Sequence, residues 1–86
     1  MTVRELIAEL SAMDPDRLVV LQKDAEGNGY SPLVGCDDNA GYMADSTWAG
    51  EVGRQRLTKV DREIGYGDED LCSKDAVPCV VLFPVN

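Results

Sequence analysis

The first part of the chain alternates apolar and polar residues with the period of a helix. Its apolar positions lie three or four residues apart, as they do on one face of a helix: Val3, Leu6, Ile7 and Leu10. Thr2 and Glu5 have the Thr-x-x-Glu spacing of a capping box, which marks a helix start. Pro15 disfavours helical geometry in the residue before it. The pattern predicts an amphipathic helix over residues 3–12.

Later segments rich in branched apolar residues predict strands over residues 17–22, 30–37 and 76–85. The last of these is apolar on both faces, so we expect it to be a central strand covered on at least one side. A turn-forming stretch with two glycines and an asparagine, residues 24–29, predicts the loop between the first two strands.

The middle of the chain has a weaker pattern. Residues 38–53 contain glycines and little periodicity, so we expect irregular structure with a short strand near Tyr42 and Met43. Residues 57–60 predict a weak strand or a helical turn, and residues 65–70 predict an exposed loop.

One helix followed by several short strands predicts an α+β fold, with one N-terminal amphipathic helix packed on a small antiparallel sheet. A chain of 86 residues is long enough for a single small domain with a thin core, so residues 1–86 are expected to form one domain. No apolar run reaches the ~18 residues that a membrane span needs. The start of the chain has no apolar signal-peptide core.

Charge is the strongest feature of the composition. Sixteen acidic and eight basic side chains give a net charge of −8, and there is no histidine. A field of this sign repels phosphates, so we expect no direct binding of nucleic acid. The same negative field favours a partner with a positively charged surface. The simpler alternative is that the acidic side chains only keep the protein soluble.

The loop after Asp24 resembles the beginning of a calcium-binding loop. Asp24, Glu26, Asn28 and Gly29 occupy the first, third, fifth and sixth positions of an EF-hand pattern. Gly35 stands at the twelfth position, where a bidentate glutamate is needed. A polar hairpin loop is therefore the favoured interpretation, and we expect no metal.

The sequence offers no complete catalytic constellation. The adjacent acids Asp37 and Asp38, and the acidic run at residues 68–70, lie in turn-like sequence where carboxylates are usually solvated. No serine lies in a nucleophile elbow. The three cysteines, an odd number without a disulfide framework, are typical of a reducing compartment: Cys36, Cys72 and Cys79. We expect no enzymatic activity and no cofactor.

Trp48 is the only tryptophan, and it lies in a segment with few apolar neighbours. A tryptophan in a loop can anchor an interface. In so small a domain it can equally close one end of the core. The sequence leaves both interpretations open.

Four segments together resemble a group of small acidic proteins encoded by tailed bacteriophages and prophages: MTVRELIAEL, DAEGNGYSPL, DSTWAGEV and AVPCVVLFPVN. The resemblance implies a phage source and a compact domain, and it transfers no catalytic residue. Some small acidic phage proteins inhibit bacterial immunity, the anti-CRISPR proteins among them, and some of these inhibitors occupy DNA-binding surfaces. By analogy, the leading hypothesis is an anti-CRISPR-like inhibitor that binds a basic, nucleic-acid-binding surface of a defence complex in the host bacterial cytoplasm.

The residues expected to contact this partner are acidic or aromatic: Asp24, Glu26, Tyr30, Asp37, Asp38, Asp45, Trp48 and Glu51. The alternative hypothesis is a small phage accessory or structural protein that acts through oligomerisation, without enzymatic activity. It predicts an exposed apolar patch and a mass that depends on concentration. Neither hypothesis involves a membrane.

Overall fold

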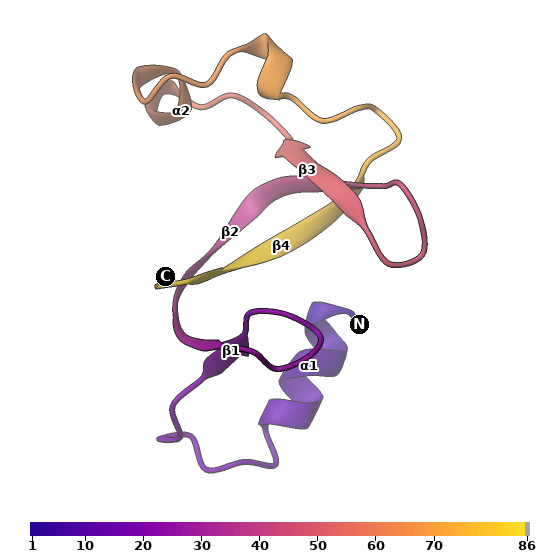
Figure 1. Cartoon of the computed structure of the whole chain (residues 1–86). Coiled ribbons are helices and arrows are strands. Elements are labelled where there is room, and N and C mark those ends of the chain that lie inside the picture. The colour runs from indigo at the N-terminus through magenta and orange to yellow at the C-terminus, as the bar shows by residue number, and fades with distance from the viewer. Residues whose placement is uncertain (86) are drawn as a thin grey trace. The chain divides into compact units, whose positions relative to one another are not determined.

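The computed structural model describes residues 1–85 and divides the chain into two compact units. Within the described residues, unit 1 contains Met1–Gly35 and residues 82–85, and unit 2 contains Cys36–Val81. The four strands form one antiparallel sheet in which β2 pairs with β1, β3 and β4. One N-terminal helix and a small antiparallel sheet confirm the predicted α+β class (Figure 1).

Unit 1 begins with helix α1 (Val3–Leu10). The predicted capping box is present: the Thr2 hydroxyl accepts a hydrogen bond from the Glu5 amide at 3.2 Å, and the Glu5 carboxylate accepts one from the Thr2 amide at 3.4 Å. The helix ends two residues earlier than predicted. The Ser11 amide and hydroxyl both donate to the Ile7 carbonyl there, at 2.9 Å and 2.6 Å.

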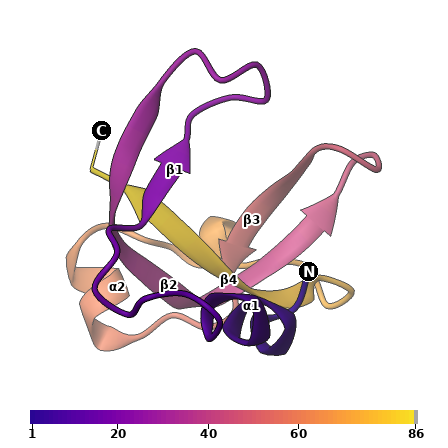
Figure 2. The same cartoon turned by 90° about the horizontal axis from the view of Figure 1, so that it is seen from below.

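Strand β1 (Val20–Gln22) pairs antiparallel with the first residues of β2 (Tyr30–Ala44), with Val20 opposite Pro32. Figure 2 shows the loop that joins the two strands. It turns at Gly27, whose φ of 76° lies in the left-handed region. The strand predicted from residue 17 begins only at Val20, because Asp14 holds the preceding residues in a turn. Its carboxylate accepts from the Asp16 amide at 2.9 Å.

In unit 2, β2 continues to Ala44 and pairs with β3 (Gly50–Arg54). The strand expected near Tyr42 and Met43 is confirmed, but the irregular structure expected over the rest of residues 38–44 and 50–53 is wrong. The reason is a pair of glycines directly opposite each other, Gly41 and Gly53. A Cβ on Gly41 would lie 2.7 Å from the Cys72 sulfur, and one on Gly53 would lie 2.8 Å from the Cys72 backbone. These glycines are strand residues that leave room for the chain at Cys72.

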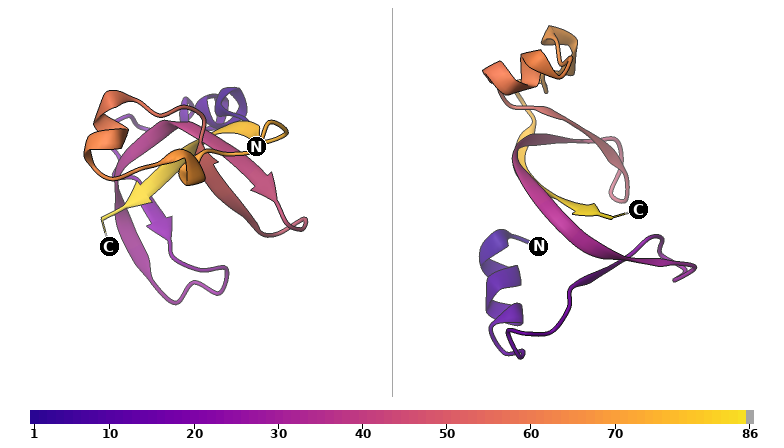
Figure 3. Two further views of the ribbon diagram at one scale, coloured as in Figure 1. Left: turned by 90° about the horizontal axis from the view of Figure 1, so that it is seen from above. Right: turned by 90° about the vertical axis from the view of Figure 1, so that its left-hand side faces the viewer.

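A second helix, α2 (Lys59–Glu63), follows β3. Thr58 and Asp61 cap it with the same reciprocal pair of hydrogen bonds that caps α1. A 3-10 turn, η1 (Asp68–Asp70), comes next, and the Cys72 amide then donates to the Arg54 carbonyl at 2.8 Å. Figure 3 shows α2 and this turn in unit 2. Of residues 57–60, Lys59 and Val60 begin the helix and Thr58 caps it, which matches the second of the two predicted possibilities, a helical turn.

Strand β4 (Val77–Pro84) confirms the last predicted strand. It pairs with β2, but its side chains are half-buried or exposed, which does not match the expected central position. Among the described residues, Ala40 is the buried apolar side chain and its neighbour Gly41 is buried as well, whereas the buried polar residues are Ser31, Asn39 and Asp61. Polar contacts therefore contribute much of the order in this chain.

Candidate functional site

The hairpin tip between β2 and β3 is the exposed feature of unit 2 that fits a binding role. We define it as residues 45–49 with Glu51, the first charged residue of β3. The tip is ordered by its own backbone, because the amides of Asp45 and Ser46 both donate to the Ala49 carbonyl, at 2.9 Å and 3.1 Å. The Trp48 amide donates to the Ser46 hydroxyl at 3.3 Å. Gly50 closes the turn where a Cβ would lie 2.6 Å from the Met43 carbonyl oxygen.

Trp48 is 85% exposed at this tip. The interpretation that it closes one end of the core is therefore wrong, and the indole is free to contact another molecule. A tryptophan on an ordered turn loses little backbone freedom when it binds, because the turn already fixes its backbone.

Two acidic residues flank Trp48 in the sequence of the tip, Asp45 and Glu51. Glu51 lies directly opposite Met43 in the β2–β3 register, and Asp45 follows Met43 by two positions. Residues directly opposite each other in a pair of strands share a face, so Met43 and Glu51 lie on one face of the hairpin, and Asp45 lies just beyond the end of β2. Both carboxylates are exposed, and neither forms an ion pair with any of residues 1–85. The tip therefore carries two acidic side chains without ion pairs and one exposed tryptophan.

Asp37, at the other end of this part of β2, has a different role. Its carboxylate binds the Arg54 guanidinium, and the second guanidinium nitrogen donates to both oxygens of Asp61, at 3.0 Å and 3.3 Å. The guanidinium also lies 5.2 Å from the centre of the Tyr66 ring. Eight residues separate Asp37 from Asp45, which is up to ~26 Å along a strand. The structure does not bring these two predicted site residues together.

Asn39 forms hydrogen bonds both to this ion-pair cluster and to the backbone of Arg56. Its side-chain amide donates to the Arg56 carbonyl at 2.9 Å and accepts from the Arg56 amide at 3.1 Å. Its own amide donates to Asp37 at 2.8 Å. This hydrogen bond, together with Arg54, holds the pKa of Asp37 below its ordinary value. The Thr58 amide and Arg54 lower the pKa of Asp61 in the same way.

Low pKa values keep both carboxylates ionised near neutral pH, whereas a catalytic acid needs a raised pKa. The cluster therefore has a structural role: its ion pairs join β2, β3 and α2. Sequence reasoning missed Arg54 and Asp61 as its members. The Thr58-x-x-Asp61 spacing is a capping signature that could have indicated Asp61.

Three of the predicted site residues belong to unit 1: Asp24, Glu26 and Tyr30. The other predicted site residues belong to unit 2. The Asp24 carboxylate accepts from the amides of Glu26 and Asn28, at 2.9 Å and 3.2 Å. The Asn28 amide is the main reason that the pKa of Asp24 is lowered. Asp24 thus organises its own polar hairpin loop. Residues 1–85 contain no group of three or more His, Cys, Asp or Glu side chains placed to hold a metal ion.

The remaining candidates are isolated. Asp38 is exposed and forms no ion pair within residues 1–85. The three cysteines are free thiols, with Cys36 exposed and Cys72 and Cys79 half-buried. A shallow hollow of about 330 Å³ in unit 2 is lined by one carboxylate, Asp75, and by no basic group. These features do not assemble into a catalytic arrangement.

No protein-family model matches the chain, and no curated protein or solved structure is similar to it. Within residues 1–85, no helix is both long enough and apolar enough to cross a bilayer. The geometry of the hairpin tip is therefore the basis for a functional argument.

Proposed function

We propose that the protein acts by occupancy: the hairpin tip inserts Trp48 into a partner's surface while Asp45 and Glu51 meet basic side chains around it. The observation that carries the proposal is the 85% exposure of Trp48 on a hydrogen-bonded turn between two unpaired carboxylates. Tryptophan is among the side chains that most often dominate the binding energy of an interface. The flanking charges would select where the ring docks.

The net charge of −8 supports the same mechanism at longer range. A strongly acidic protein approaches a basic surface faster than a neutral one, and the gain falls as salt screens the field. Charge therefore contributes to the rate of encounter, and the indole contributes to the lifetime of the complex.

The partner that we propose is a basic, nucleic-acid-binding surface on a bacterial defence complex, as in anti-CRISPR inhibition. This step is supported by the acidic charge and by the resemblance to small phage proteins. Of the eight residues predicted to contact the partner, the proposal keeps Asp45, Trp48 and Glu51. It leaves out Asp37, because that carboxylate is occupied by Arg54.

The test is an inhibition assay with purified, guide-loaded CRISPR effector complexes, in which binding of labelled target DNA is measured as the protein is added. Trp48→Ala is expected to weaken inhibition by about thirtyfold or more, the effect of losing a hot-spot side chain. Glu51→Lys is expected to weaken it in a salt-dependent way. Glu63→Lys is the matched control, because it makes the same charge change on an exposed position of α2.

Equal inhibition by Glu51→Lys and Glu63→Lys would show that only the total charge matters and that the tip is not the contact. No inhibition of any effector complex by the unsubstituted protein would contradict the proposed partner class. The same variants then test the tip against other basic nucleic-acid-binding defence proteins.

A second candidate, a small phage accessory or structural protein that works as an oligomer, is favoured by a separate observation. Large apolar side chains in unit 1 are exposed, on α1 and on the segment that follows it. Exposed apolar patches of this kind are typical of association surfaces.

A further inference from the structure

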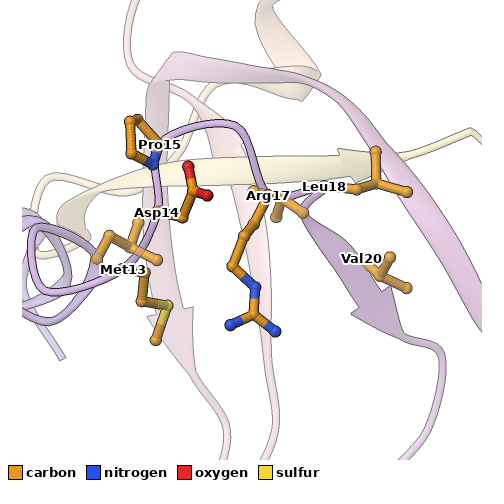
Figure 4. Close-up of a pocket in the computed structure, with 8 residues that line it drawn as sticks. Met13, Asp14, Pro15, Arg17, Leu18 and Val20 are labelled. Atoms are coloured by element: carbon orange, nitrogen blue, oxygen red, sulfur yellow. The ribbon is translucent and has the colours of Figure 1, made fainter.

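Unit 1 contains an apolar groove that the hairpin tip does not involve. It has a volume of about 490 Å³ and is lined mainly by apolar side chains: Leu10, Met13, Pro15, Leu18, Val19 and Val20. Figure 4 shows Met13 on one side and Leu18 and Val20 on the other, with Arg17 extended between them. Leu18 is 76% exposed, so unit 1 itself does not fill this groove.

The apolar stripe of α1 continues the same surface. Val3, Ile7 and Leu10 lie at helical spacing, and Ile7 is 59% exposed. None of the eight residues of α1 is buried. A helix this short is marginal in water without packing on its apolar side, so its capping box alone leaves it weakly stabilised. A partner that covers the stripe would stabilise the helix.

We infer that this face of unit 1 is a self-association surface, on which two copies of the chain pair about a two-fold axis. The face consists of the α1 stripe and the groove. Seven of its side chains are between 44% and 76% exposed: Val3, Ile7, Leu10, Met13, Leu18, Val19 and Val20. At about 100 Å² of apolar area for each fully buried side chain, they offer roughly 400 Å². A standard interface of ~800 Å² per partner, about 57% apolar, needs a comparable amount.

The charges at the groove favour a second copy over a basic partner. One carboxylate, Asp14, and one guanidinium, Arg17, line the groove, and neither forms an ion pair within residues 1–85. A two-fold interface repeats each contact, so Arg17 of one copy can meet Asp14 of the other and the reverse. The lining of the groove is thus neutral and self-complementary in a protein whose net charge is −8. This inference rests on the second candidate function, association through unit 1, and it does not depend on the hairpin-tip proposal because it involves no residue of the tip.

Sedimentation equilibrium of the full chain over a range of about 1 µM to 1 mM, which brackets typical weak dimers, tests the inference. We expect a mass that rises from 9.4 kDa toward twice that value. Leu18→Gln is expected to raise the dissociation constant about tenfold or more, because each dimer loses two leucine contacts. Ile64→Gln is the matched control, since Ile64 is 67% exposed in unit 2 and lies outside the face.

Arg17→Glu is a second variant that changes a charge and leaves the apolar side chains of the face in place. It would set a carboxylate against Asp14 of the other copy, so we expect it to weaken the dimer as well. Far-ultraviolet circular dichroism confirms that each variant keeps its secondary structure. A protein that stays monomeric at every concentration overturns the inference. Equal effects of Leu18→Gln and Ile64→Gln overturn it too, and Trp48→Ala should leave the dimer unchanged.

Discussion

Arg54 shows how a single basic residue organises the acidic side chains around it. Its guanidinium binds Asp37 and Asp61, and the ring of Tyr66 lies beside it. Asp61 is 5% exposed and Asn39 is 7% exposed, so this polar cluster occupies the place that apolar side chains take in a larger core. Removing one member would leave its partners desolvated and unpaired.

This cluster predicts how stability depends on pH. The pKa of Asp37 and that of Asp61 are both lower in the folded protein than the ordinary value of 3.8. The stability that they contribute is therefore complete above the unfolded pKa of about 3.9. It is lost as the pH falls through the lower folded values. We expect the free energy of unfolding to decline below about pH 4, as urea denaturation at a series of pH values would show.

Asp61→Asn isolates this contribution. The amide oxygen can still accept at the cap of α2, but the group no longer titrates, so the decline below about pH 4 should become shallower. Asp38→Asn is the control, because Asp38 is exposed and lies outside the cluster. If the two variants show the same pH dependence as the unsubstituted protein, the cluster does not carry the acid sensitivity.

At the scale of the elements, the sequence predicted the helix whose stabilising contacts lie between residues close together in the chain. The capping box at Thr2 and the apolar spacing of residues 3–10 predicted α1, because both depend on neighbours within one helical turn. The sequence predicted a short strand near Tyr42 and Met43, but not that β2 runs without interruption from Tyr30 through Gly41 to Ala44. That strand depends on Gly53 and Cys72, which are twelve and thirty-one residues further along the chain than Gly41.

The glycine pair leads to a prediction about this element. Gly53→Ala would place a methyl group 2.8 Å from backbone atoms of Cys72. This close contact can be relieved only if the backbone at one of the two residues shifts. We expect a loss of about 1–3 kcal/mol in the free energy of unfolding, the usual cost of overpacking. Gly35→Ala is the control in the same sheet, because nothing lies within 4 Å of its added Cβ. Thermal and urea unfolding should show Gly35→Ala as neutral or stabilising; equal losses would mean that strand propensity, not crowding at Cys72, explains both.

For the molecule as a whole, the acidic composition was visible in the sequence, but its distribution was not. No pattern along the chain indicates that Asp37 pairs with Arg54 while Asp45 and Glu51 stay free, because pairing depends on the β2–β3 register. The sequence also left open whether Trp48 is buried or exposed. The candidate site therefore has three of the eight predicted residues, Asp45, Trp48 and Glu51, and the structure shows that all three are exposed.

The net charge predicts opposite effects of salt on the two proposed associations. Two copies that each carry −8, with centres about 30 Å apart, repel each other by on the order of 3 kcal/mol at about 0.01 M salt. At about 0.15 M the repulsion is a few tenths of a kcal/mol. Exposed rim ion pairs contribute ~0–1 kcal/mol each, too little to reverse this trend. We therefore expect self-association to tighten by about a hundredfold between these salt concentrations.

Binding of the hairpin tip to a basic surface should instead weaken over the same range, because salt screens an attraction there. Sedimentation equilibrium measures the first association, and fluorescence of Trp48 titrated with a purified basic partner measures the second. Glu51→Lys should reduce the salt dependence of partner binding by more than Glu63→Lys does. A dimer that weakens with added salt would mean that ion pairs, not the apolar face of unit 1, hold the two copies together.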